Sequence, residues 1–111
     1  LKALKPSTKQ RFLAIEFDFL PRLQEIAIVS MESGLDEARV APLVDLAQRL
    51  RALKGVDVEE GVSTRLLVYC ASLVDSGMDV RQAVRAAMIE PLTDDPDVRS
   101  ALIEVAHAVI A

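Results

Sequence analysis

The pattern of apolar and polar positions changes at Pro21. Before it, residues 13–19 alternate large apolar side chains with small or acidic ones, and Leu13, Ile15, Phe17 and Phe19 share one face. A period of two is typical of a half-buried β-strand, which Pro21 would end. After Pro21 the apolar positions recur every three or four residues, which predicts helices up to the end of the chain.

The first two helices are predicted on either side of Gly34, which can end a helix in the left-handed conformation. Residues 22–32 would turn one face inward, consisting of Leu23, Ile26, Ala27, Ser30 and Met31. A second helix would be capped by Asp36 and end at Gly55, with a stripe formed by Val40, Leu43, Val44, Ala47, Leu50 and Leu53. Pro42 must either belong to the first turn of a late-starting helix or kink it.

The third helix is predicted to start at Ser63 and to close at Ser76-Gly77. It is apolar nearly all round, so we expect it at the buried centre of the domain, with Cys70 buried and Tyr69 bonded to a backbone carbonyl. Asp79 and Gln82 have capping-box spacing and would open a short helix that turns Val80, Ala83, Val84, Ala87 and Met88 inward. Asp95 and Pro96 would begin the last helix, whose stripe is Val98, Ala101, Leu102, Val105, Ala106 and Val109.

One strand followed by about five helices predicts an all-α fold class: a small helical bundle preceded by one orphan β-strand. A lone strand cannot satisfy its own backbone N–H and C=O groups. The simplest interpretation is that residues 1–20 are the tail end of an α/β domain and residues 21–111 a complete helical domain. Pairing of the strand between two copies of the chain is the other way to satisfy it.

Composition narrows the function classes. The net charge of −4 argues against a nucleic-acid-binding protein, and no apolar run is long enough to cross a bilayer. The single cysteine, Cys70, excludes an intrachain disulfide and fits a reducing, cytoplasmic location.

Few residues suggest chemistry. The four glycines are isolated, so no phosphate-binding loop occurs, and one cysteine with one histidine cannot form a zinc site. The cluster Asp94, Asp95 and Asp97 resembles a metal site, but its place at a helix start favours capping, so we expect no metal. His107, near the end of the last helix, is expected to be structural or solvated.

Arg65 is the best candidate site residue, because it follows Ser63 in the first turn of the third helix. The helix N-terminus is already partly positive, so a cation there makes sense if an anion such as phosphate binds beside it. The alternative interpretation is an ordinary solvated arginine at a helix start.

Several segments together identify a family resemblance. They are Lys5-Pro6-Ser7-Thr8-Lys9-Gln10-Arg11-Phe12, Ile15-Glu16-Phe17-Asp18-Phe19, Glu32-Ser33-Gly34-Leu35-Asp36-Glu37, Gly61-Val62-Ser63-Thr64-Arg65-Leu66-Leu67-Val68-Tyr69 and Glu90-Pro91-Leu92-Thr93-Asp94-Asp95-Pro96-Asp97-Val98. Nearly end to end, the chain resembles the C-terminal part of MoxR-type AAA+ ATPases of the CbbQ/NorQ/NirQ branch. The last two segments are specific to that branch.

The resemblance implies a role for particular residues. Residues 13–19 would be the last strand of the AAA+ α/β domain, and residues 21–111 its helical lid. Arg65 looks like the sensor 2 arginine, which contacts the γ-phosphate of ATP, with Ser63 in the same nucleotide-binding segment. Arg11 stands where the family carries an arginine finger that acts on the adjacent subunit, although Gln10 replaces an acid common in relatives. ATP and Mg²⁺ would be cofactors of the parent protein, whose Walker motifs and sensor 1 would lie upstream, and none is expected on this chain alone.

The resemblance also implies partners. Such proteins act as chaperone-like activators in ring hexamers, with a partner that bears a von Willebrand factor A domain. Their target enzyme is Rubisco in the CbbQ type and nitric oxide reductase in the NorQ/NirQ type, and the residues do not choose between them. The alternative is a stand-alone helical protein–protein interaction domain without nucleotide binding, for which the orphan strand would have no use.

Overall fold

The computed structural model describes residues 20–53 and 61–110, and this part of the chain is helical and contains no β-strand. It consists of five α-helices: α2 (Arg22–Ser33), α3 (Glu37–Arg51), α4 (Thr64–Asp75), α5 (Val80–Val84) and α6 (Pro96–Val109). A π-helix, η1 (Arg85–Ile89), and a 3₁₀-helix, η2 (Glu90–Leu92), connect α5 to α6. The predicted all-α bundle is therefore confirmed, while the predicted strand 13–19 and Gly55 lie outside the described residues.

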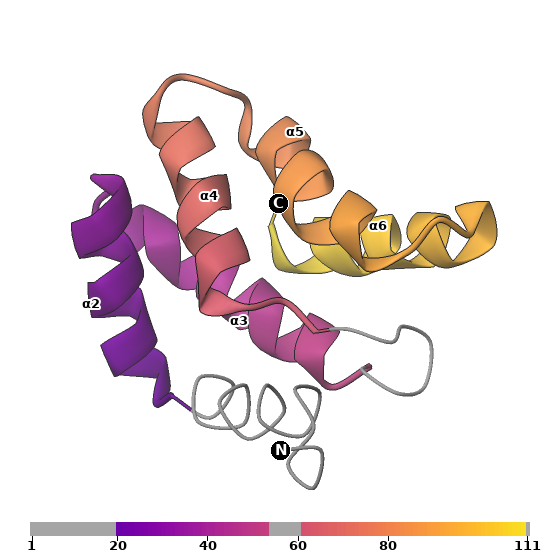
Figure 1. Cartoon of the computed structure of the whole chain (residues 1–111), viewed down its shortest axis with the longest axis horizontal. Coiled ribbons are helices and arrows are strands. Elements are labelled where there is room, and N and C mark those ends of the chain that lie inside the picture. The colour runs from indigo at the N-terminus through magenta and orange to yellow at the C-terminus, as the bar shows by residue number, and fades with distance from the viewer. Residues whose placement is uncertain (1–19, 54–60, 111) are drawn as a thin grey trace, which may run out of the picture.

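Helix α4 occupies the middle of the bundle (Figure 1). It contacts α2, α3, α5 and η1, while α6 packs against α3 and η1. Helices α2 and α4 run side by side in the same direction, so their N-termini meet at one end of the bundle and their C-termini at the other (Figure 1). This parallel pairing brings the start of α4, where Arg65 lies, beside the start of α2.

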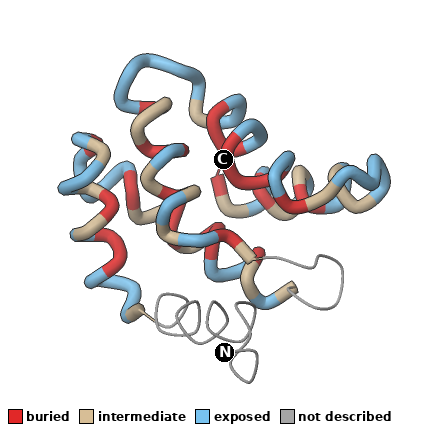
Figure 2. Tube along the Cα trace, viewed as in Figure 1, coloured by how far each residue is buried: buried red, intermediate tan, exposed pale blue. Residues whose placement is uncertain are grey.

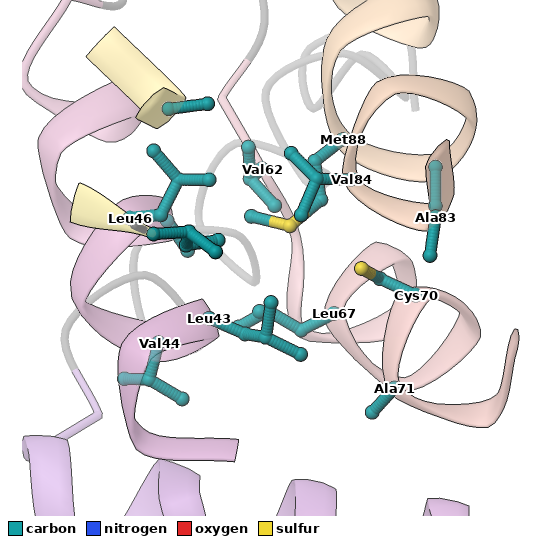
Figure 3. Close-up of a cluster of buried hydrophobic side chains, with 14 of the residues drawn as sticks. Leu43, Val44, Leu46, Val62, Leu67, Cys70, Ala71, Ala83, Val84 and Met88 are labelled. Carbon is teal, nitrogen blue, oxygen red and sulfur yellow. The ribbon is translucent and has the colours of Figure 1, made fainter. Parts of the chain in front are cut away.

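The core is formed by the inward faces of these helices, and buried positions line their inner sides in Figure 2. Its centre joins side chains from α3, α4, α5 and η1, which are drawn in Figure 3 with Val62 between them. These fully or almost fully buried residues include Leu43, Leu46, Val62, Leu67, Cys70, Ala83, Val84 and Met88. The prediction that Cys70 is buried is confirmed.

Local signals set the ends of most helices. Ser63, Asp79 and Asp95 each cap a helix through a side-chain oxygen that accepts a backbone N–H, as predicted. Gly34 ends α2 in the left-handed conformation with φ of 88°. Asp36 precedes α3 but makes no side-chain capping bond. Sequence signals of capping thus located the helix starts well.

The predicted inward face of α2 is confirmed at Ile26 but is otherwise wrong. Leu23 and Met31 are both 75% exposed, and the buried residues of this helix are Glu25, Ile26 and Val29. Apolarity favoured the face that contains Leu23, whereas the helix is rotated so that a carboxylate points inward. The reason is the buried partner that Glu25 finds on α3.

The structure also corrects the prediction for Tyr69 and excludes one of the two alternatives for Pro42, the late-starting helix. Tyr69 is 54% exposed, because the side of α4 that carries it is not covered by the described helices. Helix α3 begins at Glu37 and continues through Pro42, so Pro42 lies beyond the first turn of the helix. Proline has no N–H to donate to the carbonyl of Ala38, and the helix tolerates the loss of that one bond.

The stripe predicted for the last helix is only partly buried: Leu102 and Ala106 are buried, and Ala101 is exposed. The inward set of the preceding helix is confirmed, since Ala83, Val84, Ala87 and Met88 are buried. That helix runs on through η1, which the sequence pattern did not predict.

Candidate functional site

Arg65 is the second residue of α4 and is exposed at the end of the bundle where α2 and α4 begin. Within the described residues it takes part in no hydrogen bond or ion pair. Ser63, just before the helix, accepts a 3.2 Å hydrogen bond from the backbone N–H of Leu66 through its Oγ. The structure therefore brings the two sequence-predicted residues together in one capped first turn, where Arg65 is exposed.

A buried ion pair lies directly behind this turn. The guanidinium of Arg51, the last residue of α3, donates Nη1 to Oε1 of Glu25 at 2.9 Å and Nη2 to Oε2 at 2.7 Å. The Glu25 side chain is fully buried, and that of Arg51 is 10% exposed. Two parallel charge-assisted bonds fix both the distance and the plane of the guanidinium. We call this pair the Glu25–Arg51 clamp.

The clamp also holds the segment that leads into α4. Nε of Arg51 donates a 2.7 Å hydrogen bond to the carbonyl oxygen of Val62. The hydroxyl of Thr64 donates a 2.9 Å bond to Oε2 of Glu25. The Val62 side chain is itself buried in the core. The segment 62–64 is therefore fixed by a backbone acceptor, a side-chain hydroxyl and an apolar anchor, immediately before Arg65.

The electrostatics of this end of the bundle are balanced. Glu25 lies in the first turn of α2 and bonds to the first residue of α4, so its carboxylate faces the positive ends of two parallel helices. The charge of Arg51 neutralises it within the core. Among the residues that the structure describes, the exposed guanidinium of Arg65 adds a positive charge at this end of α4.

A second polar link between α2 and α3 lies at the surface. Arg22 donates Nε to one oxygen of Asp45 at 2.6 Å and Nη2 to the other at 3.2 Å. The hydrogen bond from Arg22 holds the pKa of Asp45 below its ordinary value. Both side chains are more than two-fifths exposed, so solvent screening keeps the contribution of this pair small.

Sequence reasoning did not find Glu25, Arg51 or Thr64. The available signal was weak: Glu25 shares a helical face with Ile26 and Val29, which would have indicated a buried carboxylate on that face. Its partner is 26 residues away in the chain, so only the folded arrangement identifies the pair.

Arg11 lies outside the described residues. Asp95 accepts the backbone N–H of Asp97 at 2.8 Å, which confirms the capping role, and the described residues contain no group of three acidic, histidine or cysteine side chains arranged to hold a metal. His107 is exposed in the last turn of α6.

One hollow of about 230 Å³ lies between α5, η1 and α6, and it is lined by five aliphatic side chains together with Arg81, Gln82, Arg85 and His107. Ligand pockets for small molecules usually reach about 300–1,000 Å³ and contain convergent polar groups. The volume of this hollow lies below that range. Among the described helices, none combines the length and apolarity needed to span a membrane.

Comparisons with known proteins match most of the chain. Residues 25–109 match the family model described as CbbQ/NirQ/NorQ C-terminal. The protein NorQ of Paracoccus denitrificans is 58% identical over 109 residues, which are 98% of this chain and 40% of NorQ. The denitrification regulatory protein NirQ of Pseudomonas aeruginosa is 48% identical over 111 residues, 43% of its length. The protein CbbQ of Hydrogenophilus thermoluteolus is 49% identical over 111 residues, 42% of its length. The chain thus spans about two-fifths of these relatives.

Proposed function

Because the chain belongs to the CbbQ/NirQ/NorQ C-terminal family, we propose that it is the helical lid of a MoxR-type AAA+ ATPase in which Arg65 senses the γ-phosphate of ATP. The observation that carries the proposal is the exposed Arg65 in the capped first turn of α4, on a segment held by the Glu25–Arg51 clamp. An exposed guanidinium on a held helix start, beside the N–H groups of that first turn, is suited to a phosphate oxygen. ATP and Mg²⁺ would be held by the α/β domain that precedes the lid.

Ser63 fits the same role. Its Oγ accepts the N–H of Leu66, which leaves the hydroxyl proton free to donate to an anion. Movement of the rigid helical block on binding ATP would then transmit the state of the nucleotide to a neighbouring subunit of the ring. Arg11 would act as the arginine finger on the nucleotide of that neighbour.

The names of the relatives support a proposal for the whole protein. One of them is named a denitrification regulatory protein, and the others are NorQ and CbbQ. We propose that the whole protein is a chaperone-like activator, hexameric and partnered by a von Willebrand factor A-domain protein. Its target enzyme would be nitric oxide reductase or Rubisco.

The test uses a full-length chimera in which residues 1–111 replace the matched part of NorQ of Paracoccus denitrificans. Arg65→Ala should lower ATP turnover by at least about tenfold, which corresponds to about 1.4 kcal/mol of transition-state stabilisation. Arg39→Ala, at an exposed position on α3, is the matched control and should retain full turnover. Turnover by Arg65→Ala equal to that of the unmodified chimera would refute the proposal.

Arg11 is tested in the same chimera. Arg11→Ala should lower turnover more than tenfold. Because the finger acts on a neighbouring subunit, adding subunits that retain Arg11 should partly restore hydrolysis. Hydrolysis unaffected by Arg11→Ala would remove the finger assignment and leave that of Arg65 intact.

The stand-alone interaction domain is the second candidate. It is favoured by Leu23 and Met31, which are exposed on α2 at the edge of the bundle (Figure 1). Leu23→Asp should then abolish binding to a partner protein while nucleotide turnover by the chimera is unchanged. Loss of turnover in Arg65→Ala decides in favour of the lid.

A further inference from the structure

We propose that Arg51 is a positioning residue for Arg65 and that, together with Glu25, it sets the direction in which the first turn of α4 presents the Arg65 guanidinium. The inference rests on the proposed function, since it assumes that Arg65 meets a phosphate. It concerns different residues, on α2 and α3, that no motif identifies.

The bonds of Arg51 reach both the backbone and the side chains around Arg65. Its Nε is bonded to the Val62 carbonyl, one residue before the Ser63 cap, and its two terminal nitrogens are bonded to Glu25. Glu25 in turn accepts from Thr64, one residue after the cap. The backbone is thus held on both sides of Ser63, and the direction of the following residue, Arg65, is determined by those holds.

Stability alone does not explain why this pair is charged. A buried ion pair loses the hydration of both groups, and replacing such a pair with well-packed apolar side chains is often neutral or stabilising. An apolar pair could not donate to the Val62 carbonyl or accept from the Thr64 hydroxyl. The Glu25–Arg51 clamp therefore fixes the orientation of the backbone at the point where α4 begins.

The substitution Arg51→Lys separates the effect of the positive charge from the effect of the planar arrangement of donors. The planar guanidinium presents three donors that match Glu25 and Val62 at the same time, whereas an ammonium group is a single point with rotating donors. Arg51→Lys keeps a positive charge beside Glu25 and loses the fixed fork. Arg49→Lys, at an exposed position of the same helix, is the matched control.

The experiment is a double-mutant cycle in the full-length chimera, with Arg51→Lys, Arg65→Ala and both together. The measurements are ATP turnover and the ratio of the Kd values for ADP and ATP, since only the γ-phosphate distinguishes them. Arg51→Lys should lower turnover about tenfold and reduce the preference for ATP, while Arg49→Lys changes neither. The double variant should be no worse than Arg65→Ala alone, because residues that act as a unit are not additive.

Hydrogen exchange gives a readout that does not depend on nucleotide. The amides of Leu66 and Leu67 bond to Ser63, so they report whether the first turn of α4 is held. Arg51→Lys should speed exchange at these two amides and leave Val74, in the same helix, unchanged. Thr64→Val, which removes the other hold, should give the same local pattern and replaces Arg51→Lys if the latter does not fold.

The outcomes separate the two proposals. If Arg65→Ala lowers turnover and Arg51→Lys does not, the positioning role is overturned and the lid proposal stands. Effects of the two substitutions that multiply would show that Arg51 acts independently of Arg65, and would also overturn it. If Arg65→Ala has no effect, both proposals fail, even where exchange at Leu66 shows that the clamp holds the turn.

Discussion

The hydroxyl of Thr64 donates a 2.9 Å hydrogen bond to the carboxylate of Glu25, which lies 39 residues earlier in the chain. The two residues are at the starts of parallel helices, so the bond joins the first turn of α2 to the first turn of α4. Together with the Glu25–Arg51 clamp, it makes one polar centre that ties α2, α3 and α4 together beneath an exposed arginine.

The first prediction concerns this bond. Thr64→Val keeps the shape of the side chain and removes the donor, so it should lower the free energy of unfolding by about 1.5–3 kcal/mol, the range for a bond to a charged group. Thr64→Ser keeps the hydroxyl and should cost less. Urea unfolding of the chain, followed by circular dichroism, measures both. Equal stability of the valine and serine variants would mean that the bond contributes nothing.

The second prediction concerns Gly34, which ends α2 with φ of 88°. A Cβ at this position would also stand 3.1 Å from Oδ2 of Asp75. That contact can be relieved by rotation of an exposed side chain, so the backbone conformation dominates. Gly34→Ala should lower the free energy of unfolding by about 1–2 kcal/mol. Gly34→Asn should cost less, because asparagine tolerates the left-handed region.

For the Gly34 series, urea unfolding should rank the stabilities as glycine, then asparagine, then alanine. An alanine variant as stable as the unmodified chain would contradict the assigned backbone conformation.

The helix starts could be predicted from the sequence because their signals are local. Ser63, Asp79 and Asp95 each bond to N–H groups two or three residues ahead, so the cap and its partner lie within one turn. The same holds for the place of Arg65 in the first turn of α4. The sequence pattern and the structure agree on these helix starts because the capping contacts join residues within one turn.

The inward face of α2 could not be predicted in the same way. Its rotation depends on Arg51, which is 26 residues from Glu25, and apolarity alone favoured the side with Leu23 and Met31. The prediction that Tyr69 is buried was wrong for a related reason, because whether its side of α4 is covered depends on where the neighbouring helices pack. The Glu25–Arg51 clamp could therefore not be predicted from the sequence, because it forms only where α2, α3 and α4 pack together.

The third prediction is a pH dependence that arises from Cys70. Burial raises the pKa of the Cys70 thiol from 9.0 to about 12, because the thiolate would lose its hydration. The neutral thiol is therefore favoured in the folded state. Its stabilising contribution is complete below about pH 9 and should be lost between about pH 9 and 12, as the unfolded chain ionises first. The slope approaches about 1.4 kcal/mol per pH unit.

The Cys70 effect is isolated by comparison with Cys70→Ala, since the other ionisable groups are common to both chains. The difference in the free energy of unfolding should shrink as the pH rises above about 9. A difference that stays constant up to pH 11 would show that the thiol ionises in the folded state. Thiol reagents at pH 8 should likewise modify Cys70 only after the chain unfolds.

The last prediction concerns Asp75. Its carboxylate lies at the C-terminal ends of α2 and α4, whereas the carboxylate of Glu25 lies at their N-terminal ends. Asp75 is the last residue of α4, and its carboxylate lies beside Gly34 at the end of α2, so a negative charge faces the negative ends of two parallel helices. Asp75→Asn removes that charge at nearly constant shape and should raise the free energy of unfolding by about 0.3–1 kcal/mol. Asp95→Asn is the matched control, because it removes a charge from the N-terminus of α6 and should be destabilising, even though asparagine also caps well. Both effects should shrink in 1 M salt, where the Debye length is about 3 Å. If Asp75→Asn and Asp95→Asn change stability in the same direction, the helix ends do not determine the effect of these charges.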